Sequence, residues 1–195
     1  MPSAPSPAEL LADLAAAFAS LNLGWYVFGA QAALIWGRPR LTTDVDVTVQ
    51  LGGVEPARLV ATLETHGFAR RLQVTDAFVD QTRVLPLMHE PSGLALDIVL
   101  AGPGLEELFL SRAVHVDVAG VDVPFISPED LIVTKILAGR SKDIEDVRGV
   151  LAERGDRLSV SDIDQVLAMV EDALGQSDLR PVFQAELARW RARTR

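Results

Sequence analysis

The sequence predicts an α+β fold in which a mixed β-sheet flanked by helices precedes an all-helical C-terminal part. Two observations support this fold class. Segments with strand periodicity alternate with helical segments as far as residue 126, and no strand periodicity follows Ser127. We therefore expect an α/β domain over residues 1–126, in which residues 1–7 form a flexible arm, and a helical region over residues 127–195.

The first five expected elements have clear apolar patterns and end signals. Apolar side chains recur at helical spacing in residues 8–22, and residues 44–51 alternate between apolar and polar types without exception. Gly29 ends a short apolar run directly before a helical segment, and Gly67 is a typical helix stop. We expect a helix over 8–22, a strand over 25–28, a helix over 30–36, a strand over 44–51 and a helix over 56–66.

Two hairpins follow a less regular stretch. Residues 68–81 show no strong periodicity and predict only a short helix. Glu90-Pro91-Ser92-Gly93 and Ala119-Gly120 are turn sequences between apolar runs. We expect strands over 83–89, 94–100, 114–118 and 121–126, with a short helix over 105–111.

The C-terminal part begins with a helix-start sequence, Ser127-Pro128-Glu129-Asp130, which combines a capping serine, a proline at the first helical position and an acidic first turn. Every later segment has helical character. We expect helices at about 128–139, 142–153, 161–174 and 178–193. The basic C-terminal end is either a frayed terminus or an arm that contacts RNA, and its arginines are Arg189, Arg191, Arg193 and Arg195.

Composition excludes several classes of function. The chain has 195 residues, of which 49% are hydrophobic and 23% charged, as in a globular protein. It has no cysteine, which excludes disulfides, thiolate metal sites and a cysteine nucleophile. A net charge of −9 argues against binding to duplex DNA but allows a local basic cleft. The sequence shows neither a signal peptide nor a membrane span, so we expect a cytoplasmic protein with no membrane partner.

Three aspartates are the strongest functional candidates. Asp44 and Asp46 alternate with valines and therefore project from one face of a strand, about 6–7 Å apart at Cα. Asp97 is the only polar residue in the strand over 94–100. If these two strands are neighbours, the three carboxylates come together, and their oxygens favour Mg²⁺ or Mn²⁺. The alternatives are a solvent-facing polar strand for the pair and, for Asp97, a sheet edge or a salt bridge to an arginine.

A candidate phosphate-binding turn precedes these carboxylates. Gly29 and Ala30 stand between a strand and a helix, where free backbone N–H groups and the positive end of the helix dipole attract anions. Arg40 and Thr43 follow this turn and supply a cation and a hydroxyl for phosphate. The histidines have no spacing typical of metal ligands, and we expect surface or hydrogen-bonded roles for His66, His89 and His115.

The order of these motifs resembles the nucleotidyltransferase superfamily that shares the DNA polymerase β-like palm. It looks most similar to the AbiEii-type nucleotidyltransferases of bacterial abortive-infection and toxin–antitoxin systems. The resemblance covers residues 27–147. It is carried by Phe28-Gly29-Ala30, Arg40-Leu41-Thr42-Thr43-Asp44-Val45-Asp46, Leu96-Asp97-Ile98, Ser127-Pro128-Glu129-Asp130-Leu131, Lys135 and Arg140-Ser141-Lys142-Asp143-Ile144-Glu145-Asp146.

The resemblance implies a palm in which the catalytic carboxylates, Asp44, Asp46 and Asp97, hold Mg²⁺ or Mn²⁺. A nucleoside triphosphate (NTP) would lose pyrophosphate, and its nucleoside monophosphate would pass to an acceptor hydroxyl that Asp97 activates. The residues implied in nucleotide binding are Gly29, Ala30, Arg40, Thr43, Lys135 and Asp143. Relatives usually have Gly or Ser where this chain has Ala30, so this cradle offers backbone N–H groups but no hydroxyl. For Lys135 and Asp143 the alternative is an exposed polar helix face.

Three functions remain open from the sequence. The first is transfer of a nucleoside monophosphate to tRNA or to a protein, in a toxin–antitoxin or phage-defence setting with a cognate toxin or antitoxin protein as partner. The second is nucleotidylation of a small cationic molecule such as an aminoglycoside, which an acidic chain attracts. The third is a catalytically degenerate binding or antitoxin module that retains the fold.

Overall fold

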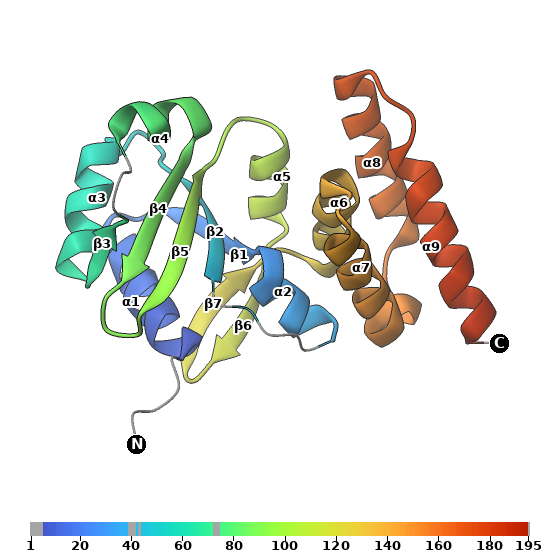
Figure 1. The fold of residues 1–195 in the computed structure, drawn as a ribbon, viewed down its shortest axis with the longest axis horizontal. Helices are drawn as coiled ribbons and strands as arrows, with labels where there is room; N and C mark the ends of the chain where they lie inside the picture. The colour runs from blue at the N-terminus through green and yellow to red at the C-terminus, as the bar shows by residue number, and fades with distance from the viewer. Residues whose placement is uncertain (1–5, 39–41, 43, 72–74, 195) are drawn as a thin grey trace. The chain divides into compact units, whose positions relative to one another are not determined.

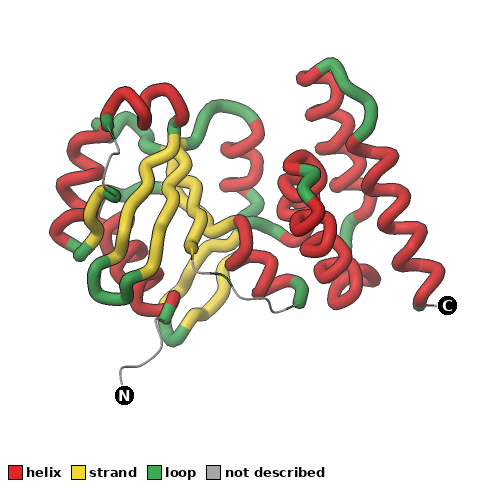
Figure 2. The backbone as a smooth tube through the Cα atoms, viewed as in Figure 1, coloured by secondary structure: helices red, strands yellow, loops and turns green. Residues whose placement is uncertain are grey.

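The computed structural model describes residues 6–38, 42, 44–71 and 75–194 (Figures 1 and 2). The chain divides into two compact units, of which the first comprises residues 1–31 and 42–126 and the second residues 32–41 and 127–195. The predicted α+β class is confirmed, with its mixed sheet, flanking helices and all-helical C-terminal part. Among the described residues, no helix is long and apolar enough to cross a membrane.

The first unit is built on one mixed sheet. Its strands in the described residues are β1 (Gly24–Phe28), β2 (Asp44–Gln50), β3 (Phe68–Arg70), β4 (Val84–His89), β5 (Leu94–Leu100), β6 (Val114–Val118) and β7 (Val121–Phe125). Their order across the sheet is β3-β4-β5-β2-β1-β7-β6. The β2–β5 and β1–β7 pairs are parallel and the other neighbouring pairs are antiparallel. The strand that carries Asp44 and Asp46 is therefore central.

Helices connect these strands along the chain (Figure 1). They are α1 (Pro7–Ser20), α2 (Gly29–Trp36), α3 (Pro56–Thr65), α4 (Asp76–Thr82) and α5 (Leu105–Ser111). Residues 32–36 of α2 belong to the second unit. α1 contacts β7 and α3, and α5 contacts β1. The valines of β2 are fully buried at positions 45, 47 and 49, whereas Asp44 is exposed. One face of β2 thus belongs to the core and the other carries polar groups.

Two details near the N-terminal half differ from the expected pattern. α1 begins at Pro7, inside the segment expected as an arm, because the Ser6 hydroxyl accepts a hydrogen bond from the Ala8 N–H at 3.3 Å and caps the helix. The short strand β3 lies in the stretch for which only a helix was expected. It has only three residues, of which Phe68 is buried, so it leaves no alternating pattern to detect.

The second unit is helical in all its described elements. These are α6 (Pro128–Ala138), α7 (Ser141–Arg154), a 3₁₀ turn (Gly155–Arg157), α8 (Val160–Leu174) and α9 (Leu179–Arg193). As the sequence predicts, the Ser127 hydroxyl caps α6 by accepting from the Asp130 N–H at 3.1 Å. Two nitrogens of Arg148 donate to the buried Glu186 carboxylate, each at 2.8 Å, and join α7 to α9. Hydrogen bonds from Arg148 lower the pKa of Glu186.

His89 is a fully buried tie between α1 and the β4–β5 hairpin. Its Nε2 lies 3.0 Å from Asp13 Oδ2 and its Nδ1 lies 2.7 Å from Ser92 Oγ. An ionised carboxylate only accepts hydrogen bonds, so Nε2 donates to Asp13, while Nδ1 shares a hydrogen bond with the Ser92 hydroxyl. This histidine has a packing role, in keeping with the hydrogen-bonded role expected from the sequence.

Replacing Asp13 by alanine leaves the buried Nε2–H of His89 without its acceptor. We expect the free energy of unfolding to fall by about 1–3 kcal/mol, the usual cost of an unsatisfied buried polar group. Urea denaturation of the full chain measures this change. The control is Glu64→Ala, which removes an exposed carboxylate from α3. Equal stability losses in the two variants would contradict the structural role of His89.

Candidate active site

Strand register brings two of the three candidate aspartates into neighbouring positions. β2 and β5 run parallel, and Asp46 is the direct partner of Asp97. Asp44 lies two residues earlier on β2, so all three share one face of the sheet. On the other side of β2, Asp46 is paired with Phe28, the last residue of β1. The sheet therefore places the end of β1 and the three carboxylates in one small area.

Asp44 is held by hydrogen bonds from two residues that precede it in the chain. The Thr42 hydroxyl donates to Asp44 Oδ1 at 2.6 Å and lies 3.3 Å from the Asp44 carbonyl oxygen. The buried Gln31 side chain, in α2, donates to the same carbonyl at 3.5 Å. These contacts fix the start of β2. Of the residues expected to bind nucleotide, Arg40 and Thr43 lie outside the described residues.

Gly29 lies against the Asp46 side chain. It begins α2 with a φ of +65°, a left-handed conformation that side chains disfavour. A Cβ atom at this position would lie 2.0 Å from Asp46 Oδ2. The absence of a side chain at Gly29 therefore makes room for the Asp46 carboxylate. Ala30, the second residue of the expected phosphate cradle, is buried at the start of the same helix.

Asp97 forms an ion pair with Arg71. Arg71 Nη2 donates to Asp97 Oδ1, and about a third of each side chain is exposed. Burial raises the pKa of Asp97 above its ordinary value; Arg71 opposes this shift and the charge of Asp44 adds to it. The influence of Asp44 shows that these carboxylates interact.

The three aspartates fit a divalent cation in donor chemistry and in strand placement. Carboxylate oxygens are the ligands that Mg²⁺ and Mn²⁺ prefer, and the register puts all three on one face. Within the described residues, the side chains as they stand do not form a group of three or more acids or histidines ready to hold a metal. Arg71 holds an oxygen of Asp97 in this arrangement. Their role as metal ligands therefore stays a prediction.

Comparison with known families identifies the fold. The model of a family described as "nucleotidyltransferase of unknown function (DUF6036)" matches residues 19–174. The chain belongs to this nucleotidyltransferase family. The match includes all three aspartates and Gly29. A search of curated proteins finds no match to the sequence.

Several solved structures have a similar fold. The antibiotic-resistance factor ANT(2'')-Ia, in complex with adenylyl-2''-tobramycin, has a TM-score of 0.58 at 18% identity over 86% of this chain and 98% of its own. The lincomycin-bound lincosamide adenylyltransferase LnuA has a TM-score of 0.53 at 15% identity over 76% of this chain and 98% of its own. An antigenic nucleotidyltransferase-like protein from Paracoccidioides brasiliensis has a TM-score of 0.51 at 17% identity, with 95% and 94% covered. At these identities the likeness shows the shared fold.

Lys135 and Asp143, which the resemblance implies in nucleotide binding, contact each other in the helical unit of this nucleotidyltransferase. Lys135 Nζ lies 3.2 Å from Asp143 Oδ1 and 2.7 Å from Asp146 Oδ2, and only 7% of the lysine side chain is exposed. Burial raises the pKa of Asp143, but hydrogen bonds from Arg140 and Lys135 outweigh it and lower the pKa. These residues tie α6 to α7. Their contact with a triphosphate stays a prediction.

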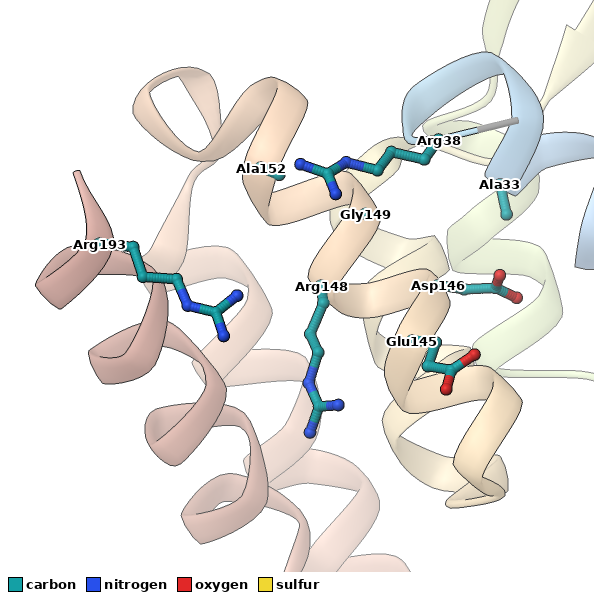
Figure 3. A pocket seen from close by; sticks show the side chains of 8 residues that line it. All are labelled: Ala33, Arg38, Glu145, Asp146, Arg148, Gly149, Ala152 and Arg193. Atoms are coloured by element: carbon teal, nitrogen blue, oxygen red, sulfur yellow. The ribbon is translucent and has the colours of Figure 1, made fainter. Parts of the chain in front are cut away.

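The helical unit also holds an arginine-lined pocket of about 350 Å³. Figure 3 shows Arg38, Arg148 and Arg193 entering it from three different segments, with Glu145 and Asp146 nearby. A smaller adjoining hollow adds Arg189 and Trp190. Lys135 balances the charge of Asp146. Arg38 Nε lies 3.6 Å from Glu153 Oε1, and this ion pair is exposed and therefore weak. Arg148 is already bound to Glu186, so Arg38 and Arg193 are the guanidinium groups that this pocket could offer to an anionic ligand.

Sequence reasoning missed Arg71 and the arginine-lined pocket. Arg71 follows β3, and its side chain reaches Asp97 on β5 across the intervening strand β4. The strand β3 has no sequence signal, so this proximity could not be predicted. The pocket arginines come from residues 38, 148 and 193, which are far apart along the chain. Only the concentration of arginine at the C-terminal end pointed toward it.

Proposed function

We propose that this protein transfers a nucleoside monophosphate from an NTP to a hydroxyl of a macromolecular acceptor, either tRNA or a protein. The observation that carries the proposal is the in-register pair of Asp46 and Asp97, with Asp44 on the same face and Gly29 against Asp46. Membership of a nucleotidyltransferase family supports it. The proposed biological setting is AbiEii-like, with a cognate toxin or antitoxin protein as partner.

Each residue of the site has a defined part in this reaction. Asp44, Asp46 and Asp97 would hold Mg²⁺ or Mn²⁺, and the bound metal would neutralise and orient the triphosphate oxygens. Gly29 lets the backbone approach the substrate phosphates, and the start of α2 presents N–H groups to them. Thr42 keeps Asp44 in position. Arg40, Thr43, Lys135 and Asp143 are further nucleotide contacts in this proposal.

The transfer reaction needs no reactant besides the NTP and the acceptor hydroxyl. The acceptor hydroxyl oxygen forms a bond to the α-phosphorus, and the bond from that phosphorus to the bridging oxygen of pyrophosphate breaks. The hydroxyl proton passes to Asp97, the proposed general base.

The arginine-lined pocket favours an anionic acceptor. Its guanidinium groups suit the phosphates of RNA better than the ammonium groups of an aminoglycoside. A small cationic acceptor is the second candidate, and the net charge of −9 favours it. A degenerate binding or antitoxin module is the third, favoured by the Arg71–Asp97 ion pair and by Ala30 in place of a serine.

The test is a labelling assay with the purified full chain. We expect α-³²P from one or more of the four NTPs to appear on bulk tRNA or on a protein of a bacterial extract, only when Mg²⁺ or Mn²⁺ is present. Label on tobramycin or kanamycin alone would replace this proposal with the small-molecule reaction. If no acceptor becomes labelled in a metal-dependent way, the proposed enzyme activity is overturned and the binding module is favoured.

A further inference from the structure

Arg71 belongs to the same row of the sheet as the candidate active-site carboxylates. It directly follows β3, and its backbone N–H donates to the Pro86 carbonyl at 3.3 Å, which continues the β3–β4 pairing by one residue. Pro86 is the partner of Asp97, and Asp97 is the partner of Asp46. Neighbours in such a row project from one face of a sheet. The Arg71 side chain therefore extends over Pro86 toward the carboxylates.

The guanidinium of Arg71 is only partly satisfied by this arrangement. Nη2 donates to Asp97 Oδ1, but Nε is buried and has no hydrogen-bond partner among the described residues. A buried N–H without a partner is costly. The neighbouring residue, Arg70, points to the opposite face, where its Nη1 lies 2.6 Å from Asp76 Oδ1.

Arg71 and a divalent cation would use the same oxygen atoms. The Asp97 carboxylate stands next to Asp46 and close enough to Asp44 to be affected by its charge. A positive charge at this point relieves the repulsion between the acids, whether a guanidinium or a metal ion supplies it. The two cations would compete because both are attracted to the Asp97 carboxylate, of which Arg71 already holds Oδ1.

We propose that Arg71 competes with the divalent cation for Asp97 and closes the site until the metal displaces it. The inference rests on the proposed function in one respect, that Asp44, Asp46 and Asp97 bind a divalent ion. Arg71 acts through Asp97 and is a positioning residue. Its effect is to lower the affinity of the empty protein for a free divalent ion, so that the carboxylates are not permanently metallated.

The test measures Mn²⁺ binding to the full chain by the loss of the free-ion electron paramagnetic resonance signal. We expect Arg71→Gln to lower the Kd for Mn²⁺ by about fivefold to tenfold, the scale of losing one charged competing hydrogen bond. Arg70→Gln removes the same charge one residue away on the other face and should leave the Kd unchanged. Arg71→Met, which keeps the apolar stem, serves if the glutamine variant does not fold.

The Asp97→Asn variants complete the design. The gain from Arg71→Gln should disappear when Asp97→Asn is also present, because the two cations no longer share that ligand. Equal Kd values for wild type and both Arg71 variants, or an equal gain in Arg70→Gln, would overturn the inference alone. Absence of Mn²⁺ binding in every variant would overturn the proposed function, and the inference with it.

Discussion

Replacing Asp46 by asparagine reduces nucleotide transfer by at least about a thousandfold, a loss typical of removing a charged group that acts on the transition state. Asp46 lies beside three other residues of the site. It is the register partner of both Asp97 and Phe28, and its Oδ2 lies against Gly29. Asparagine has the same shape as aspartate, so the fold should be retained. It lacks the negative charge that would hold the metal, so activity should be lost.

The measurement is kcat/KM with labelled NTP and the acceptor found in the labelling assay. Asp117→Asn makes the same chemical change on the exposed strand β6 and should keep full activity. Circular dichroism of both variants is the control for correct folding. More than a tenth of wild-type activity in Asp46→Asn would contradict the assignment of Asp46 to the site.

Replacing Gly29 by alanine produces the second largest expected effect. The new Cβ would lie 2.0 Å from Asp46 Oδ2, so the carboxylate or the start of α2 must move. If Asp46 is the proposed metal ligand, a displacement of about 1 Å of its carboxylate costs about a hundredfold in rate. The left-handed backbone adds a stability loss of about 1–2 kcal/mol.

The control for Gly29→Ala separates backbone strain from displacement of Asp46. Gly93 has a φ of +68°, almost the same as the +65° of Gly29, but a Cβ there meets nothing within 4 Å. Gly93→Ala should therefore show a similar drop in melting temperature with transfer activity unchanged. If both alanine variants transfer nucleotide at equal rates, the close approach of Gly29 to Asp46 has no catalytic role.

The elements with strong local patterns could be predicted from the sequence. The alternation in residues 44–51 predicts β2 correctly, because one face is buried valine and the other carries Asp44 and Asp46. The lone acid in residues 94–100 singled out Asp97 because a carboxylate among buried aliphatic side chains needs a partner. The alternative of a salt bridge to an arginine is also realised, in the Arg71 pair.

Features that depend on long-range pairing could not be predicted. The parallel β2–β5 register, which makes Asp46 and Asp97 neighbours, joins strands separated by the whole β3–β4 region. No local pattern encodes that pairing. Arg71 illustrates the consequence, because it reaches Asp97 only through the unpredicted strand β3 and its partner β4. The resemblance to nucleotidyltransferases could still be recognised from the sequence, because the motifs of that superfamily are short and local.

The most direct test of the proposed site is a crystal structure of the full chain grown with Mn²⁺ and a non-hydrolysable NTP analogue, using anomalous diffraction to locate manganese. We expect anomalous density bounded by the carboxylates of Asp44, Asp46 and Asp97, triphosphate oxygens on the same ion, and the Arg71 side chain away from Asp97. Manganese and nucleotide bound elsewhere, with Arg71 still paired to Asp97, would contradict the site.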